Sequence, residues 1–373
     1  RNGELKTDGK SISGYQKLGN HTQVYIYLET DQQPLKIGTH QGAVIRTTDK
    51  STQGHNAYYI LEYPKGTASV LLRYGVSFIS SEQAKQNLRR EIKNYNLQAV
   101  ADKGRSVWNE TLGKIFVKGG TENEKTVFYT SLYRTYERMI CISEDGRYFS
   151  AYDGQVHDDE GIPFYVDDWI WDTYRATHPL RLIIETEMES NMVNSLIRMA
   201  YQMQPNWMPT FPEINGDSRR MNCNHGVATV LDAYNKGMRS FDLAKAYQVC
   251  KAAITEKTLA PWSSKPAGVL DQFYKDHGYF PALAVGEQET VPEVHSWERR
   301  QPAAVTLGTV YDEWCLGNIA QALGDKKEAD YFLKRSLNYH KIFNKETCFF
   351  HPKDSFGNFI QPFDYRYSSG VGG

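Results

Sequence analysis

The chain has 373 residues, with 43 Lys and Arg residues against 44 Asp and Glu residues. This length predicts two domains. The balanced charge argues against nucleic acid or an anionic membrane surface as a partner, because neither polyanion would be attracted. No apolar run approaches the about 20 residues that a membrane span needs. The five cysteines form no Cys-x-x-Cys pair, so neither a zinc site nor a redox dithiol is indicated, and their odd number and wide spacing indicate no disulfide framework.

Residues 1–80 have the composition of β structure. Runs rich in β-branched and aromatic residues, such as 24–29 and 69–79, alternate with clusters of Gly, Asp and Gln. Several such strands predict a β-sandwich. A helical connector is expected over residues 81–122, with Ser80 or Ser81 as its N-cap and one strand over 115–120 at its end.

From residue 123 onward the apolar spacing changes to the period of a helix, about 3.6 residues. Gly237 and Gly324 are expected to end two of these helices. Paired long helices without a fixed repeat length predict an α/α toroid rather than a solenoid, with loops gathered around a pocket at one mouth. The expected helices cover residues 124–140, 185–203, 225–236, 241–253, 303–323 and 326–343.

One stretch, residues 164–180, differs from the helices around it. A carboxylate accepts hydrogen bonds from vicinal hydroxyl groups, and an indole face covers the apolar face of a sugar ring, so this composition predicts a sugar site. Two structural alternatives stay open: Asp172 could cap a helix that begins at Thr173, and the tryptophans could lie in the core. The polar and aromatic residues of the stretch are Asp167, Asp168, Trp169, Trp171, Asp172, Arg175 and His178.

Residues 171–180, Trp-Asp-Thr-Tyr-Arg-Ala-Thr-His-Pro-Leu, resemble the signature of the family 92 glycoside hydrolases, which are calcium-dependent exo-α-mannosidases. The resemblance covers nearly all of the chain. It implies a multidomain β plus α protein: an N-terminal β-supersandwich to which residues 1–80 belong, a helical linker over 81–122, and an (α/α)6 toroid over 123–373 whose C-terminal part is missing. Further segments that resemble the family follow in its order, at 81–88, 117–133, 187–196, 224–237, 311–315 and 361–366.

The resemblance also implies a chemistry, inverting hydrolysis of a terminal α-linked mannose, of the α-1,2 type, from a mannose-containing glycan. Calcium would hold two vicinal hydroxyl groups of the sugar. Trp171 and Asp172 are expected to bind the mannose and Arg175 to brace them. His225 could line the pocket, although a capping or core role is favoured. An exported bacterial protein, periplasmic or at the cell surface, is expected.

The chain departs from the family pattern in two places. Gly308 stands where the family has its acidic glutamate, and a glycine cannot donate a proton. Asp312, Glu293 and Glu298 are weak candidates to replace that acid. The family segments that carry the calcium ligands and the catalytic base are not in this sequence, so both are expected beyond Gly373 and no metal ligand is assigned within the chain.

Three other functions stay open. A glycosyl phosphate leaves as a stable anion that needs little protonation, so a mannosyl-phosphodiesterase could work without the acid at Gly308. A catalytically silent mannan-binding protein would use Trp171 and Asp172 for binding alone. An unrelated toroid enzyme such as a lyase is the third alternative. Gly308 could also serve packing, by letting a neighbouring backbone come close.

Overall fold

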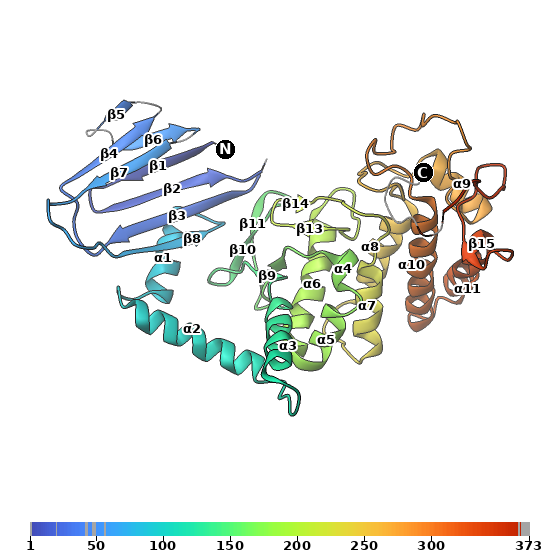
Figure 1. The fold of residues 1–373 in the computed structure, drawn as a ribbon, viewed down its shortest axis with the longest axis horizontal. Coiled ribbons are helices and arrows are strands. Elements are labelled where there is room, and N and C mark those ends of the chain that lie inside the picture. The colour runs from blue at the N-terminus through green and yellow to red at the C-terminus, as the bar shows by residue number, and fades with distance from the viewer. Residues whose placement is uncertain are drawn as a thin grey trace. The chain divides into compact units, whose positions relative to one another are not determined.

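The computed structural model describes residues 2–19, 21–41, 44–46, 50–55, 57–364 and 366. The chain divides into two compact units, Arg1–Phe164 and Tyr165–Gly373, and each is described by itself. Strands make up most of residues 2–77 and helices dominate the second unit, as predicted (Figure 1). The predicted limits at residues 80 and 122 stay predictions. Tyr365 and residues 367–373, part of the predicted 361–366 motif and toroid, lie outside the described residues.

Two antiparallel sheets form the N-terminal part of the first unit. The order of the five-stranded sheet is β6-β1-β2-β3-β8, and that of the three-stranded sheet is β5-β4-β7. The hydroxyl of Tyr59 on β7 donates to the carbonyl of Lys50 at 2.9 Å, beside the start of β6. The strands are β1 (Gly3–Thr7), β2 (Ser11–Lys17), β3 (Gln23–Thr30), β4 (Lys36–Gln41), β5 (Val44–Arg46), β6 (Ser51–Gly54), β7 (Ala57–Glu62) and β8 (Leu72–Ser77).

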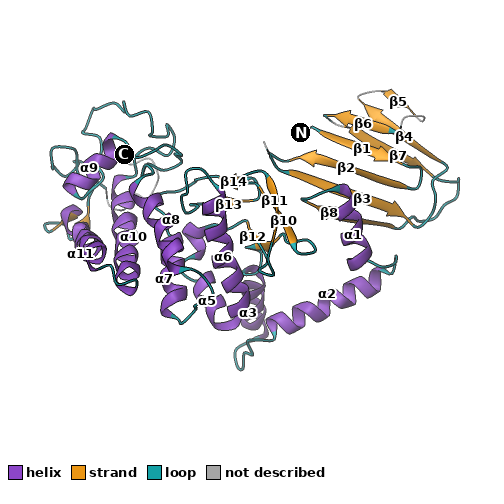
Figure 2. Ribbon diagram, turned by 180° about the vertical axis from the view of Figure 1, so that it is seen from behind, coloured by secondary structure: helices purple, strands orange, loops and turns teal. Residues whose placement is uncertain are grey.

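Helix α1 (Ser81–Glu91) lies against β3 and β8 (Figure 2). The side chain of Ser80 caps it by accepting the N–H of Gln83 at 3.0 Å, which confirms one of the two predicted caps. Ala84 and Leu88 of α1 are buried. A Cβ on Gly75 of β8 would come 2.1 Å from the carbonyl oxygen of Ala84, so only glycine allows this close approach.

The connector forms two further helices, α2 (Leu97–Leu112) and α3 (Glu122–Arg134). The strand predicted over 115–120 is wrong: this segment is a loop that ends with Gly119 and Gly120 at φ values of +82° and +70°. The helix predicted over 124–140 ends at Arg134, because the next N–H groups bond to carbonyls three residues back. The strands β9 (Ile140–Cys141), β10 (Arg147–Ser150) and β11 (Gln155–Asp158) follow.

The second unit is helical, and its helices α6, α7, α8 and α10 run side by side (Figure 1). The predicted helices are confirmed within about three residues, except that the last divides into α11 and the 3-10 helix η1. Gly237 and Gly324 end α7 and α10 with φ values of +94° and +81°. The elements are β12 (Tyr165–Val166), α4 (Ile170–Thr173), α5 (Thr177–Ile184), α6 (Thr186–Gln202), β13 (Pro212–Glu213), β14 (Gly216–Asp217), α7 (Gly226–Asn235), α8 (Leu243–Thr255), α9 (Val269–His277), α10 (Pro302–Ala322), α11 (Lys326–Arg335), η1 (Ser336–Ile342), β15 (Phe343–Asn344) and β16 (Phe349–Phe350).

The core of the second unit lies between α6, α7, α8 and α10, whose buried side chains are mostly apolar. All five cysteines are free thiols. Cys141 and Cys348 are exposed, whereas Cys223, Cys250 and Cys315 are buried. Among the described residues, no helix combines the length and apolarity that crossing a bilayer requires.

The close packing of α1 on β8 can be tested at Gly75. We expect Gly75→Ala to lower the free energy of unfolding by about 1–3 kcal/mol, because the new methyl group overlaps the carbonyl of Ala84. Gly104→Ala, inside α2 with open space around its Cβ position, should instead stabilise by about 0.5–1 kcal/mol. Urea denaturation followed by circular dichroism measures both changes, and equal effects would contradict the packing.

Candidate active site

The stretch 164–180 is anchored by a buried histidine between two carboxylates. His178 on α5 contacts Asp168 through Nε2 at 2.8 Å and Glu189 of α6 through Nδ1 at 2.7 Å. All three side chains are at most 1% exposed. Thr173 donates to the second oxygen of Asp168 at 2.9 Å, so both oxygens of this carboxylate are used. These contacts fix both ends of the short helix α4.

The histidine of this cluster carries a positive charge. Burial alone would lower its pKa, but the charges of Glu189 and Asp168 outweigh burial and raise the pKa of His178 to about 10. Burial also opposes ionisation of Asp168, yet His178 holds the pKa of that carboxyl below its ordinary value. Arg181, buried beside them, contributes in the same direction. Two anions and two cations therefore balance inside the unit.

The anchored segment presents the residues of the predicted sugar site outward. Trp169 is 37% exposed and stacks on Phe211 with ring centroids 5.5 Å apart. Trp171 is partly exposed and Asp172 exposed. The core alternative for the tryptophans is therefore wrong. So is the capping alternative for Asp172, because α4 begins at Ile170 and includes Asp172.

Arg175 lies over two of the aromatic rings. Its guanidinium carbon is 5.9 Å from the ring centroid of Trp171 and 5.6 Å from that of Tyr174. Both distances are within the range of cation–π attraction. The predicted bracing role of Arg175 therefore has a geometric basis, whereas sugar binding by Trp171, Asp172 and Arg175 stays a prediction.

A second anchor comes from α10 and joins the signature stretch through Tyr174. Asp312 is buried, and its Oδ1 lies 2.7 Å from Nδ1 of His225 while its Oδ2 accepts the N–H of Asn224 at 2.8 Å. The ring of His225, at the start of α7, lies 4.3 Å from that of Tyr174. The structure thus brings together His225 and Asp312, two of the predicted site residues, next to the signature stretch.

Gly308 on α10 lies against the side chain of Cys223, which leaves no room for a larger residue at position 308. A Cβ built there would lie 2.2 Å from Sγ of Cys223 and 3.5 Å from Cε1 of His225. Cys223 holds a left-handed backbone conformation at φ +64°, which non-glycine residues rarely adopt. Burial and then the charge of Asp312 raise the pKa of the Cys223 thiol well above its ordinary value. Gly308 therefore does allow a close approach, as the packing interpretation expected, but the neighbour is the side chain of Cys223 and not a backbone.

The two other candidate acids have different neighbours. Glu298 accepts a hydrogen bond from the side-chain amide of Gln301 at 2.7 Å, just before α10. The carboxylate of Glu293 lies beside Gly268, the residue that precedes α9. Neither contact links these residues to Gly308, and replacement of the acid by Glu293, Glu298 or Asp312 stays a prediction.

The sequence interpretation missed the Asp168–His178–Glu189 cluster. His178 was named only as a residue of the stretch, without a partner, and Glu189 was not singled out. A signal for Glu189 was present, because it shares one face of α6 with Met192, Val193 and Leu196, at helical spacing. A carboxylate on such an apolar face needs a buried cation nearby.

The described part of the chain contains no group of three or more His, Cys, Asp or Glu side chains that could hold a metal ion. Calcium prefers six to eight oxygen ligands. No calcium ligand is therefore assigned among the described residues.

Comparison with known proteins identifies the family. The sequence profile of the glycosyl hydrolase family 92 catalytic domain matches residues 83–372, and the chain belongs to this family. A secreted glycosidase of uncharacterised activity from the fungus Arthroderma benhamiae is 25% identical over 340 residues, which cover 86% of this chain and 37% of that protein.

Solved structures of the family have the same fold. A family 92 inverting mannosidase from Bacteroides thetaiotaomicron aligns over 97% of this chain and 48% of its own, with a TM-score of 0.83 and 27% identity. An α-mannosidase from the same organism, solved with mannoimidazole, aligns over 97% and 46%, with a TM-score of 0.82 and 22% identity. The present chain thus spans less than half the length of these relatives.

The buried charge cluster predicts a pH dependence of stability. The pKa of His178 rises from 6.5 when unfolded to about 10 when folded, so its stabilising contribution is complete below about pH 6.5 and is lost as the pH rises towards 10. The midpoint of thermal unfolding should therefore fall across this range. NMR of labelled imidazole should show His178 protonated at pH 8, and deprotonation near pH 6.5 would contradict the assignment.

The same cluster predicts the effect of removing its centre. His178→Gln should lower the free energy of unfolding by about 3–5 kcal/mol, because two buried carboxylates lose their cation. His157→Gln is the matched control, since His157 pairs with Asp153 at a partly exposed site and should cost less than about 1 kcal/mol. Denaturant titration measures both changes in the free energy of unfolding, and equal changes would contradict the proposed role of His178 as an anchor.

The contact between Gly308 and Cys223 predicts a coupled pair. Gly308→Glu alone should destabilise by about 1–3 kcal/mol. Adding Cys223→Gly should remove much of this cost, because glycine vacates the space and suits the left-handed backbone. A double-mutant cycle by chemical denaturation should give a coupling of about 0.5–3 kcal/mol, whereas additive effects would contradict the contact.

Proposed function

We propose that the protein takes part in inverting hydrolysis of terminal α-linked mannose, of the α-1,2 type, from mannose-containing glycans. The observation that carries this proposal is the fold of the signature stretch. Trp171 and Asp172 are presented to solvent on a short helix whose flanking residues, Asp168 and His178, are locked in the interior. Membership of the family supports the reaction class.

Each outward side chain has a role that follows from its chemistry. The indole of Trp171 would cover the apolar face of the mannose ring, and Asp172 would accept hydrogen bonds from its hydroxyl groups. Arg175 would hold the indole in position from above. His225, oriented by the carboxylate of Asp312, would contribute a polar group at the same edge.

The proposal extends to the whole gene product. Inversion needs a carboxylate that activates water, and this base and the calcium ligands are proposed to lie beyond Gly373. In this proposal residues 1–80 would be part of a β-supersandwich, residues 81–122 a linker, and residues 123–373 part of an (α/α)6 toroid. Export to a periplasm or cell surface is supported by the secreted fungal relative.

A second candidate function is favoured by the environment of Gly308. The thiol of Cys223 fills the space above this glycine, so nothing on α10 at this position can protonate a leaving oxygen. A phosphate monoester leaves as an anion without that proton. We propose mannosyl-phosphodiester cleavage as the alternative activity of the same sugar site.

One comparison separates these functions. The whole gene product, with calcium or with a chelator, is given α-1,2-mannobiose and the methyl diester of α-mannose-1-phosphate, and released mannose is measured. Calcium-dependent cleavage of both supports the mannosidase, and a ratio that favours the phosphate by about 10² or more supports the phosphodiesterase. If neither is cleaved but mannose binds, both enzyme proposals fail and a binding protein remains.

The sugar site itself can be tested with an indole pair. Trp171→Ala should reduce kcat/KM for whichever substrate is cleaved by about tenfold or more, because ring stacking and the contact with Arg175 are both lost. Trp108→Ala removes a comparably exposed indole from α2 and should leave kcat/KM unchanged. Equal effects of the two substitutions would remove Trp171 from the site.

A further inference from the structure

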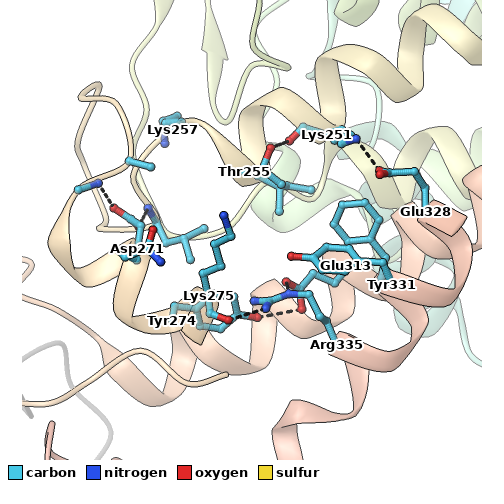
Figure 3. A pocket seen from close by; sticks show the side chains of 16 residues that line it. Lys251, Thr255, Lys257, Asp271, Tyr274, Lys275, Glu313, Glu328, Tyr331 and Arg335 are labelled. Atoms are coloured by element: carbon cyan, nitrogen blue, oxygen red, sulfur yellow. Dashed lines mark hydrogen bonds and ion pairs between the residues drawn. The ribbon is translucent and has the colours of Figure 1, made fainter. Parts of the chain in front are cut away.

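One cavity of the second unit has no role in the proposed reaction. This cavity has a volume of about 280 Å³ and lies between the C-terminal end of α8, the start of α9, the middle of α10, and α11 (Figure 3). Its walls include no residue of the stretch 164–180. Ten of its polar and aromatic wall residues are labelled in Figure 3, and seven of its sixteen residues are ionisable as Lys, Arg, Asp or Glu.

Two carboxylates of the cavity are already engaged by cations or hydroxyl groups. Glu313 accepts from Nε of Arg335 at 2.6 Å and from the hydroxyl of Tyr274 at 3.0 Å. Glu328 pairs with Nζ of Lys251 at 2.5 Å. The charges of these two carboxylates and two cations cancel, and all four side chains lie in one half of the cavity (Figure 3).

The third carboxylate is engaged by backbone. Asp271 accepts the N–H of Leu259 at 2.6 Å through one oxygen and the N–H of Gly268 at 2.7 Å through the other. With Lys257 and Lys275 included, the seven ionisable residues of the walls carry a formal charge of +1.

Lys257 and Lys275 supply the remaining positive charge. Their amino groups enter the cavity from opposite walls (Figure 3). Neither amino group has a hydrogen-bond or ion-pair partner within the described part of the chain. Lys257 is only 8% exposed. Burial lowers its pKa to about 8, although the carboxylates of Asp217 and Asp271 act against this shift at longer range.

We propose that this cavity binds a small oxyanion, a phosphate or carboxylate group, held between the amino groups of Lys257 and Lys275. A buried ammonium group without a partner is costly, and an anion between the two lysines would supply charge-assisted hydrogen bonds to both. The acids of the walls cannot do this, because their oxygens already accept other donors. The volume is below the range of about 300–1,000 Å³ typical of drug-sized ligands, so the ligand is small.

The test titrates the full chain with sodium phosphate, and separately with sodium acetate, at constant ionic strength. Saturable heat in calorimetry and a rise in the midpoint of thermal unfolding are expected for at least one anion, and the two arms distinguish phosphate from carboxylate. Lys257→Met should weaken this binding by about tenfold or more. It should also raise the midpoint without anion, because an unpaired buried charge is removed, and this rise shows that the variant folds.

Lys327→Met is the matched control. Lys327 is exposed on α11, is not among the residues that line the cavity, and should leave both anion binding and the midpoint unchanged. Lys275→Met should weaken binding as well, by a smaller factor, because Lys275 is exposed to solvent. Absence of saturable binding by either anion in the parent chain, or equal binding by parent and Lys257→Met, would overturn the proposal.

Discussion

The candidate site depends on one buried interaction, the protonated imidazole of His178 between Asp168 and Glu189. Two carboxylates in the interior are tolerated only with a matching cation, and removing that cation leaves their desolvation uncompensated. Because the three residues come from the loop before α4, from α5 and from α6, one charge cluster ties together three segments of chain. The surface of α4 is therefore presented on a rigid base, which a binding site needs if it is to lose little entropy when sugar arrives.

Another buried carboxylate, Asp312, fixes a second histidine in the same way. Asp312 on α10 holds both His225 and the backbone before α7, and the ring of His225 contacts Tyr174 of the stretch 164–180. These two anchors support the proposed sugar site, while a thiol fills the space beside Gly308, the position at which the resemblance places the proton donor. If the site binds mannose as proposed, the missing acid favours a substrate whose leaving group needs no proton.

Periodicity was enough to predict most of the helices, because their buried faces recur every three to four residues. The loop over 115–120 was mistaken for a strand, since its apolar residues resemble one and the left-handed glycines decide otherwise. Contacts between residues far apart in the sequence could not be predicted, because periodicity and spacing do not show that Cys223 fills the space above Gly308. Glu189 is intermediate between these cases. Its position on an apolar helix face predicts a buried cationic partner, but the sequence does not show which residue that partner is.

The distribution of thiols has a practical consequence for measuring how the molecule moves. Cys141 belongs to the first compact unit and Cys348 to the second, and both are exposed, whereas the other three thiols are buried. Spin labels or fluorophores attached to the natural sequence would therefore mark each unit once. The distribution of distances between such a pair, from electron resonance or energy transfer, would show whether the two units form one rigid particle or swing on their connection while a glycan enters.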